Sequence, residues 1–147
     1  MRKATLLLLV LVTSAGCATT ASVPVAPPLD DVAAKRGLSD QTKSRIYVLR
    51  RGEYKGSAIL FRIAVDGLIA GGLAPATYRY FDVEPGTHKV LAMSNENEEV
   101  REFKTEAGRE YFVVIGVRFG TMTARVGFDE APNADREILR GSQLAKE

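Results

Sequence analysis

The chain has 147 residues, 46% hydrophobic and 26% charged, with 20 Lys plus Arg against 18 Asp plus Glu. This balance excludes a wholly disordered chain, which needs fewer apolar residues and a stronger net charge, and the single cysteine excludes a disulfide-stabilised scaffold. With one histidine and no tryptophan, the chain has few of the side chains from which catalytic and metal sites are usually built.

The N-terminus has the three-part layout of a secretory signal peptide. Arg2 and Lys3 give a positive start, residues 6–12 form an unbroken apolar run, and small residues then lead to Cys17. The apolar run is far shorter than the roughly 20 residues that a membrane-spanning helix needs. We therefore expect residues 1–16 to be a signal peptide rather than a permanent transmembrane helix.

Ser14, Ala15, Gly16 and Cys17 resemble the lipobox of bacterial lipoproteins. The resemblance implies a diacylglyceryl group on the Cys17 thiol, cleavage before this residue, and acylation (palmitate, for example) of the new amino terminus. Two or three acyl chains hold a protein on a bilayer for long periods, because each buried methylene contributes ~0.8 kcal/mol. Ser14 departs from the Leu or Val that the family prefers there. The alternative is an ordinary signal peptide that leaves Cys17 as a free thiol.

The residue after the cysteine bears on the destination of the protein. Ala18 stands where Asp would retain a lipoprotein in the inner membrane, so the resemblance implies the outer membrane, with the domain facing the periplasm. Without Arg2 and Lys3, the remaining 18 basic residues equal the 18 acidic ones. Nucleic-acid binding normally draws on a clustered basic surface, so we expect no nucleic-acid partner.

Residues 17–43 are predicted to be a flexible, lipid-anchored tether. Residues 18–22 are small, and three of the six prolines fall within positions 24–28. Proline-rich stretches prefer the extended polyproline form and act as semi-rigid spacers. Residues 29–38 are compatible with a short helix that begins near Asp30 or Asp31 and ends near Gly37.

From residue 44 onward the pattern changes to short strands separated by turns. Apolar alternation predicts strands over 45–50, 58–65, 68–73, 77–83, 87–93, 100–105, 109–119 and 123–128. Asp66-Gly67 predicts a tight hairpin turn, Glu84-Pro85-Gly86 predicts another turn, and Ile138 and Leu139 are expected to pack a short last element on the sheet. Residues 44–147 are therefore predicted to form one all-β domain, an antiparallel β-sandwich of about seven or eight strands.

Several segments of this domain together resemble a known family. They are residues 45–48 (RIYV), 56–57 (GS), 65–67 (VDG), 80–88 (YFDVEPGTH) and 106–113 (EAGREYFV). The set resembles the bacterial lipoproteins of "domain of unknown function 2846" over most of residues 44–140, and residues 66–67 and 85–88 are also similar to the PEGA domain, a small β-rich surface module. The resemblance implies a β-sandwich on a lipid anchor and brings no catalytic residues.

Catalytic and metal-binding chemistry has little support in the sequence. His88 is the only imidazole, and a hydrolase would pair it with Ser57 or Ser94, yet no nucleophile-elbow pattern surrounds either serine. The acidic residues between 96 and 102 are of the type that calcium prefers, but they lack calcium-loop spacing. We expect no enzyme activity, no metal site and no cofactor.

The aromatic and basic residues of the strands form the candidate binding surface. Tyrosine rings and arginine forks suit contacts with a peptide or a glycan, and the residues are Tyr47, Arg50, Tyr78, Arg79, Tyr80 and Arg118. Ordinary cross-strand pairing would place the same residue types in the same strands and is the favoured alternative.

The predicted function is that of a non-enzymatic lipoprotein in the bacterial cell envelope, anchored through Cys17. Its sandwich is expected to bind an envelope protein or glycan, and an exposed strand edge would favour a protein, because a partner can add a strand there. One alternative is a carrier of a small apolar ligand or lipid, which requires a cavity of several hundred Å3 between the sheets. A hydrolase that uses His88 is the least favoured alternative.

Overall fold

The computed structural model describes residues 19–53, 55–130 and 134–146, so the expected signal peptide and Cys17 lie outside the described residues. The described part is mainly strand, as predicted. Its elements in chain order are α1 (Pro28–Lys35), β1 (Ser44–Arg50), β2 (Phe61–Val65), β3 (Leu68–Leu73), β4 (Thr77–Val83), β5 (Gly86–Met93), β6 (Glu98–Thr105), β7 (Glu110–Phe119), β8 (Ala124–Asp129), α2 (Asp135–Arg140) and β9 (Gln143–Leu144).

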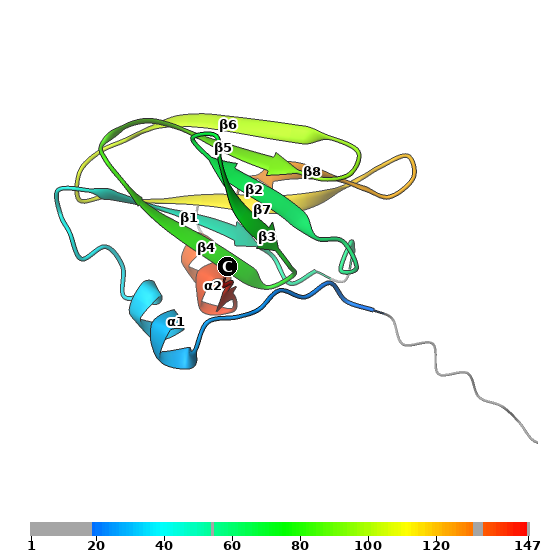
Figure 1. Cartoon of the computed structure of the whole chain (residues 1–147), viewed down its shortest axis with the longest axis horizontal. Helices are drawn as coiled ribbons and strands as arrows, with labels where there is room; N and C mark the ends of the chain where they lie inside the picture. The colour runs from blue at the N-terminus through cyan, green and yellow to red at the C-terminus, as the bar shows by residue number, and fades with distance from the viewer. Residues whose placement is uncertain (1–18, 54, 131–133, 147) are drawn as a thin grey trace, which may run out of the picture.

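The strands form two sheets that pack face to face as a sandwich (Figure 1). The first sheet has the order β8-β7-β1-β4-β9 and the second has the order β3-β2-β5-β6. Inward-facing hydrophobic side chains of both sheets fill the space between them, since alternate residues of a strand point to the same face. These buried residues are Ile46, Val48, Phe61, Ile63, Val65, Leu73, Val90, Ala92, Val113, Ile115 and Val126.

The sandwich is not purely antiparallel, which corrects one part of the prediction. β1 pairs with β4 antiparallel on one side and with β7 parallel on the other, and β4 pairs parallel with the short β9. The chain leaves the first sheet after β1 to form β2 and β3, returns as β4, leaves again to form β5 and β6, and returns as β7. The turn at Glu84-Pro85-Gly86 therefore carries the chain between sheets instead of closing a hairpin, because its two flanking strands belong to different sheets.

The hairpin between β2 and β3 has the predicted turn. Asp66 has φ 51° and Gly67 has φ 83°, and the tight turns that fit twisted hairpins need positive φ at both central residues. β2 begins later than predicted, at Phe61, because the preceding loop turns its carbonyl oxygens towards the Arg50 side chain. The guanidinium of Arg50 donates to the carbonyl oxygens of Gly56 (2.8 Å), Ile59 and Leu73 (2.8 Å).

Two short helices cover the outer face of the five-stranded sheet (Figure 1). The sequence indicated a short helix near residues 29–38 and a last element packed on the sheet, but it did not indicate that the two form one layer. Strand β1 is buried along its whole length, since even-numbered residues face the sandwich interior and odd-numbered ones face the helices. The second core includes Tyr47, Leu49, Tyr78 and Val114 from the sheet with Ala34 and Leu139 from the helices. Leu139 thus packs against the sheet as predicted, and the element that carries it is the helix α2.

The segment predicted to be a flexible tether instead packs against the domain from Ala21 onward. The Ala21 N–H donates to the Ser57 carbonyl (2.7 Å), Val25 forms a β-bridge with Ala145, and α1 lies on the sheet. The Asp31 carboxylate accepts hydrogen bonds from Lys35 Nζ (2.7 Å), the Tyr78 hydroxyl (2.9 Å) and the Leu144 N–H (2.9 Å). The compact unit is therefore larger than residues 44–147, because small and proline-rich residues here fit closely against the sheet.

Within the described residues, no helix has both the length and the apolar composition that crossing a membrane requires.

Candidate functional site

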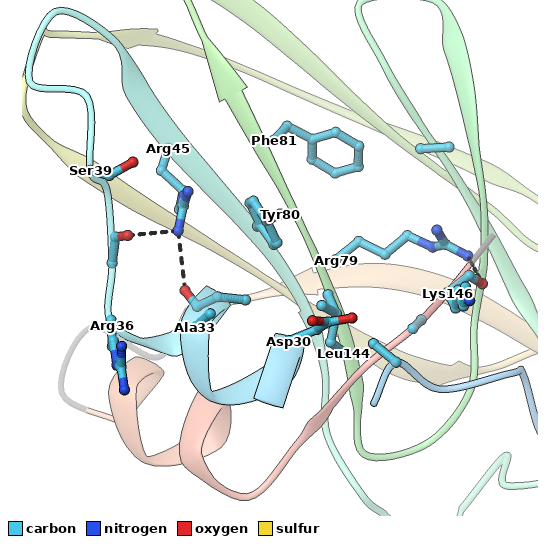
Figure 2. Close-up of a pocket in the computed structure, with 15 residues that line it drawn as sticks. Asp30, Ala33, Arg36, Ser39, Arg45, Arg79, Tyr80, Phe81, Leu144 and Lys146 are labelled. Carbon is cyan, nitrogen blue, oxygen red and sulfur yellow. Dashed lines mark hydrogen bonds between the residues drawn. The ribbon is translucent and has the colours of Figure 1, made fainter. Parts of the chain in front are cut away.

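A groove of about 920 Å3 lies between α1, strand β4 and the segment that includes β9 (Figure 2). One wall consists of Ala33, Gly37 and Ser39, at the C-terminal half of α1 and just beyond it. The opposite wall is formed by Tyr80 and its neighbours on β4, and Lys146 closes one end. At the β4 edge the groove also reaches Ala70 of β3 and Phe81 of β4, which pack against the core between the two sheets.

Arg45 holds the two walls of the groove together. Its guanidinium forms a two-point ion pair with Asp82 on β4 (2.6 and 2.8 Å) and donates to the carbonyl oxygens of Ala34 (3.1 Å) and Gly37 (2.8 Å). The last carbonyls of a helix lack partners within the helix and carry partial negative charge, so a cation stabilises them. The hydrogen bonds with Asp82 raise the pKa of Arg45 further above its ordinary value, in spite of its burial.

Tyr80 contributes the aromatic surface of the groove. The Arg45 guanidinium lies 4.2 Å from the Tyr80 ring centroid, a stacking distance at which cation and ring attract each other. Tyr80 also packs near Tyr47, with ring centroids 6.3 Å apart, and this contact fixes its position.

The backbone edge of β4 faces this groove. In the described residues β9 pairs on that side with Thr77 and Tyr78, and the edge formed by residues 80–83 continues beyond this pairing. The Ala145 N–H donates to the Tyr78 carbonyl (2.9 Å), which shows that the polar groups of Tyr78 point to this edge. Because backbone groups alternate along a strand, those of Tyr80 and Asp82 point the same way.

The charge of the groove is predominantly positive. Arg36, Arg45, Arg79 and Lys146 line it, against Asp30 as the acidic lining residue. Arg36 and Lys146 are exposed to solvent, whereas Arg79 is buried and donates to the carbonyl oxygens of Gly72 (3.3 Å) and Lys146 (3.0 Å). The exposed cations are therefore the ones that an entering group would meet first.

The structure distributes the six candidate surface residues over four places. Arg79 and Tyr80 line the groove. Tyr47 and Tyr78 are buried beneath the helices, where Tyr47 donates to the Ala34 carbonyl (2.7 Å). These two belong to the packing between sheet and helices, so the six residues do not form one surface.

The other two candidates lie elsewhere. Arg50 is 2% exposed, stands 4.4 Å over the Phe61 ring and bonds to backbone carbonyls, and its burial lowers its pKa to about 10. Arg118 is exposed on β7 and pairs with Asp129 (2.6 Å). Cross-strand pairing and core packing thus account for most of the aromatic and basic pattern.

His88 does not contact either serine that a hydrolase would need. Its Nδ1 lies 2.7 Å from an Asp66 carboxylate oxygen and its Nε2 lies 2.7 Å from the Glu84 carbonyl oxygen. The Ser94 hydroxyl, at the other end of β5, contacts Asn97. Burial lowers the pKa of His88, but the hydrogen bonds with Asp66 and Glu84 outweigh it and raise the pKa above its ordinary value.

Among the acidic residues between 96 and 102, Glu96 binds the backbone of a neighbouring loop. The Glu96 carboxylate accepts hydrogen bonds from the backbone N–H groups of Thr121 (2.7 Å), Met122 (2.9 Å) and Thr123, and these bonds lower its pKa to about 2. No group of three His, Cys, Asp or Glu side chains that suits a metal ion occurs in the described ranges.

Sequence reasoning missed most of the groove. The sequence predicts a tether at Arg36 and Ser39 and assigns no role to Lys146. It predicts Arg45 only as a residue of a strand. The weak helix signal over 29–38 was the available hint, since a helix after an extended segment needs a surface on which to pack.

Comparison with known proteins places the chain in a family. A curated protein of Haemophilus influenzae named "Uncharacterized protein" is 26% identical over 110 residues, and the match covers 75% of this chain and 66% of that protein's length. The family described as "Protein of unknown function (DUF2846)" matches residues 40–127. This match contains β1 to β7 and most of β8, which is the body of the sandwich. Because it covers more than half of the 147 residues, the chain belongs to the DUF2846 family.

Proposed function

We propose that this protein is a lipid-anchored envelope lipoprotein that binds an extended peptide segment of another envelope protein. The peptide lies in the groove between α1 and β4 and adds a strand to the outer edge of β4. The observation that carries the proposal is this outer edge, whose residues 80–83 continue beyond the pairing with β9 in the described residues and face a groove of about 920 Å3.

Strand addition supplies affinity through main-chain hydrogen bonds and specificity through side chains on alternate positions. The outward N–H and C=O groups of Tyr80 and Asp82 supply the main-chain contacts, and β9 already demonstrates the parallel pairing that a peptide would continue. The Tyr80 ring supports an aliphatic or aromatic side chain of the peptide.

The charge of the groove selects an acidic peptide. Arg36 and Lys146 lie exposed on opposite sides of the groove, while the neighbouring Arg45 charge is already paired with Asp82. Acidic side chains at the two sides of the groove therefore each meet a cation that retains solvent contact, and such charge complementarity favours the encounter.

Site-directed photocrosslinking in intact cells tests the location of the site. A photoreactive amino acid at Ser39, an exposed residue of the groove wall, is expected to give a specific polypeptide adduct. The double substitution Arg36→Glu and Lys146→Glu should reduce that adduct about tenfold, which corresponds to ~1.4 kcal/mol. The control charge reversal Arg62→Glu, on exposed β2 surface, should leave it unchanged. An equally strong adduct from a probe at Lys104 would refute the site. An adduct with a glycan would show that the groove binds a glycan and would contradict the peptide proposal.

Hydrogen exchange on the complex with the captured partner tests the binding mode. The amides of Tyr80 and Asp82 should become protected on binding, because they face the groove. Those of Arg79 and Phe81 face β1 and should already exchange slowly in the free protein. Protection of other amides on binding, with no change at the amides of Tyr80 and Asp82, would exclude strand addition.

The anchor is tested separately from the groove. An alkyne-labelled fatty acid fed to cells should be incorporated into the native chain and should be absent from Cys17→Ser, because the thiol is the proposed attachment atom. Label retained by Cys17→Ser, or a native chain released in aqueous form without label, would contradict lipidation.

The carrier hypothesis has less support from the geometry. The space between the sheets contains eleven buried hydrophobic residues from both sheets, including Phe61 and Ile115, and the groove reaches this core only at its edge, at Ala70 and Phe81. An apolar ligand between the sheets would have to displace these side chains. This would cost much free energy, because protein interiors are closely packed.

A further inference from the structure

The loop between β7 and β8 exposes the two most solvent-accessible large hydrophobic side chains of the described residues. Phe119 is 85% exposed and Met122 is 90% exposed. Single exposed apolar residues are common on protein surfaces, but two large ones within four positions on one loop form a continuous apolar tip. We call this feature, residues 119–122, the β7–β8 tip.

The β7–β8 tip is held in place by an acidic side chain from another loop. Glu96, between β5 and β6, accepts hydrogen bonds from the backbone N–H groups of Thr121, Met122 and Thr123 and from the Thr123 hydroxyl (3.0 Å). With these bonds the loop presents its apolar side chains outward in one arrangement. The exposure of Phe119 and Met122 is therefore a built feature of this end of the sandwich.

Basic side chains surround the tip. Lys55 Nζ lies 3.3 Å from the Phe119 ring centroid. Arg118 and Arg125 are cross-strand neighbours at the base of the loop, and both are exposed. Among the acidic groups of this end, Glu96 is occupied by the loop amides, while Glu53, Glu98 and Glu99 are exposed.

The described chain begins at the same end of the sandwich (Figure 1). The Ala21 N–H donates to the Ser57 carbonyl (2.7 Å), in the loop that also carries Lys55, whose Nζ lies over the Phe119 ring. Cys17 precedes Ala21 by four residues, so the chain between them spans at most about 14 Å even when fully extended. A lipid on Cys17 therefore keeps this end of the domain close to the bilayer.

We propose that the β7–β8 tip is a membrane-contact site that inserts Phe119 and Met122 into the headgroup region of a phospholipid bilayer. Lys55 and Arg125 then lie against the lipid phosphates. The inference rests on the proposed lipid anchor at Cys17 and extends it, since it fixes which end of the sandwich meets the membrane. Aromatic and basic side chains favour this interfacial zone, where apolar and charged surroundings meet.

A single-tryptophan reporter tests this contact, because the native chain contains no tryptophan. The full-length lipidated Phe119→Trp variant is placed in phosphatidylethanolamine and phosphatidylglycerol vesicles that carry brominated acyl chains. The control is Leu68→Trp, which replaces a residue that is 77% exposed at the opposite end of the sandwich. We expect bromine quenching of the tryptophan at position 119 to exceed that at position 68 about threefold or more.

Vesicle flotation separates the two levels of the proposal. If the Phe119→Trp chain floats with vesicles and Cys17→Ser does not, the anchor holds, and equal or absent quenching at both positions then overturns the membrane contact alone. If the chain with intact Cys17 stays in solution, the anchor and the contact both fail. A blue shift at position 119 that depends on protein concentration without vesicles would identify a second copy as the occupant and overturn the proposal.

Discussion

Arg45 connects three parts of the protein with one side chain. It starts on the central strand, pairs with Asp82 on the neighbouring strand, and donates to the last carbonyls of α1. The residue is 5% exposed, so its charge depends on these partners. Loss of this side chain removes hydrogen bonds from partly buried carbonyl oxygens, and a polar group that loses its partner destabilises the fold more when water cannot reach it.

The substitution Arg45→Ala is expected to lower the free energy of unfolding by about 2 kcal/mol, because it removes a buried side chain and leaves the Gly37 carbonyl without this donor. The Ala34 carbonyl keeps the Tyr47 hydroxyl as a donor, and Asp82 keeps its contact with water. Urea denaturation followed by circular dichroism measures the change. Arg45→Lys should recover only part of the loss, since an ammonium cannot replace the two-point fork. The exposed Arg125→Ala is the control and should change stability by less than about 0.5 kcal/mol. If Arg45→Ala lowers the free energy of unfolding no more than this control, the contacts of Arg45 do not stabilise the fold.

His88 and Asp66 form a pair whose contribution depends on pH. The raised pKa of His88 means that its contribution is complete below its unfolded value of about 6.5 and is lost as pH rises through the folded value. Burial raises the pKa of Asp66, but bonds to His88 and the Lys89 N–H outweigh it, so the Asp66 contribution is lost only in acid. The pair therefore stabilises the fold most between about pH 4 and 6.5.

The stability difference between the native chain and His88→Gln should be about 0.5 kcal/mol near pH 6, because the pair is partly screened by solvent. It should shrink towards pH 9, where the imidazole is neutral. Urea midpoints measured at several pH values check this trend. A difference that stays constant from pH 6 to 9 would show that the charge of His88 is not involved.

At the scale of elements, the packing of α1 decides the shape of the groove. Ala34 is 4% exposed and its carbonyl accepts hydrogen bonds from both Arg45 and Tyr47, whereas the adjacent Ala33 is exposed. The small side chain of Ala34 lets the helix approach the aromatic face of the sheet closely. The helix is eight residues long, too short to be stable without this packing.

The two neighbouring alanines provide a matched test of this packing. Ala34→Asp should lower the free energy of unfolding by about 3 kcal/mol, because it buries a carboxylate against tyrosine rings. Ala33→Asp makes the same change on the exposed face and should cost only the difference in helix propensity, about 0.7 kcal/mol. Thermal and urea unfolding measure both. Equal effects of the two substitutions would mean that α1 does not pack on the sheet in solution.

At the scale of the whole molecule, β1 couples the two cores. Its even-numbered residues belong to the core between the sheets and its odd-numbered residues to the core under the helices. A strand that is shared in this way cannot be lost from one core and kept in the other. The three layers should therefore unfold together, as small single domains usually do.

Leu49→Ala in the helix-side core and Ile63→Ala in the sandwich core are each expected to lower the free energy of unfolding by about 2 to 5 kcal/mol. In both variants, far-ultraviolet and near-ultraviolet circular dichroism should report one coincident transition. An early, separate helix transition in Leu49→Ala would show that the helical layer unfolds independently of the sandwich.

The sequence by itself determined strands β1 to β8, because the information for each is local, whereas the two-residue β9 was not predicted. Alternation of apolar residues placed β3 and β4 at their observed bounds, and Asp66-Gly67 specified its turn because that turn needs positive φ at both positions. Only the tertiary structure decided which strands are neighbours, which faces are covered, and that residues 21–35 belong to the folded unit. The groove depends on those decisions, since Arg36, Tyr80 and Lys146 meet there from three distant segments. Side chains so far apart in the chain leave no periodic signal, because long-range packing alone brings them together.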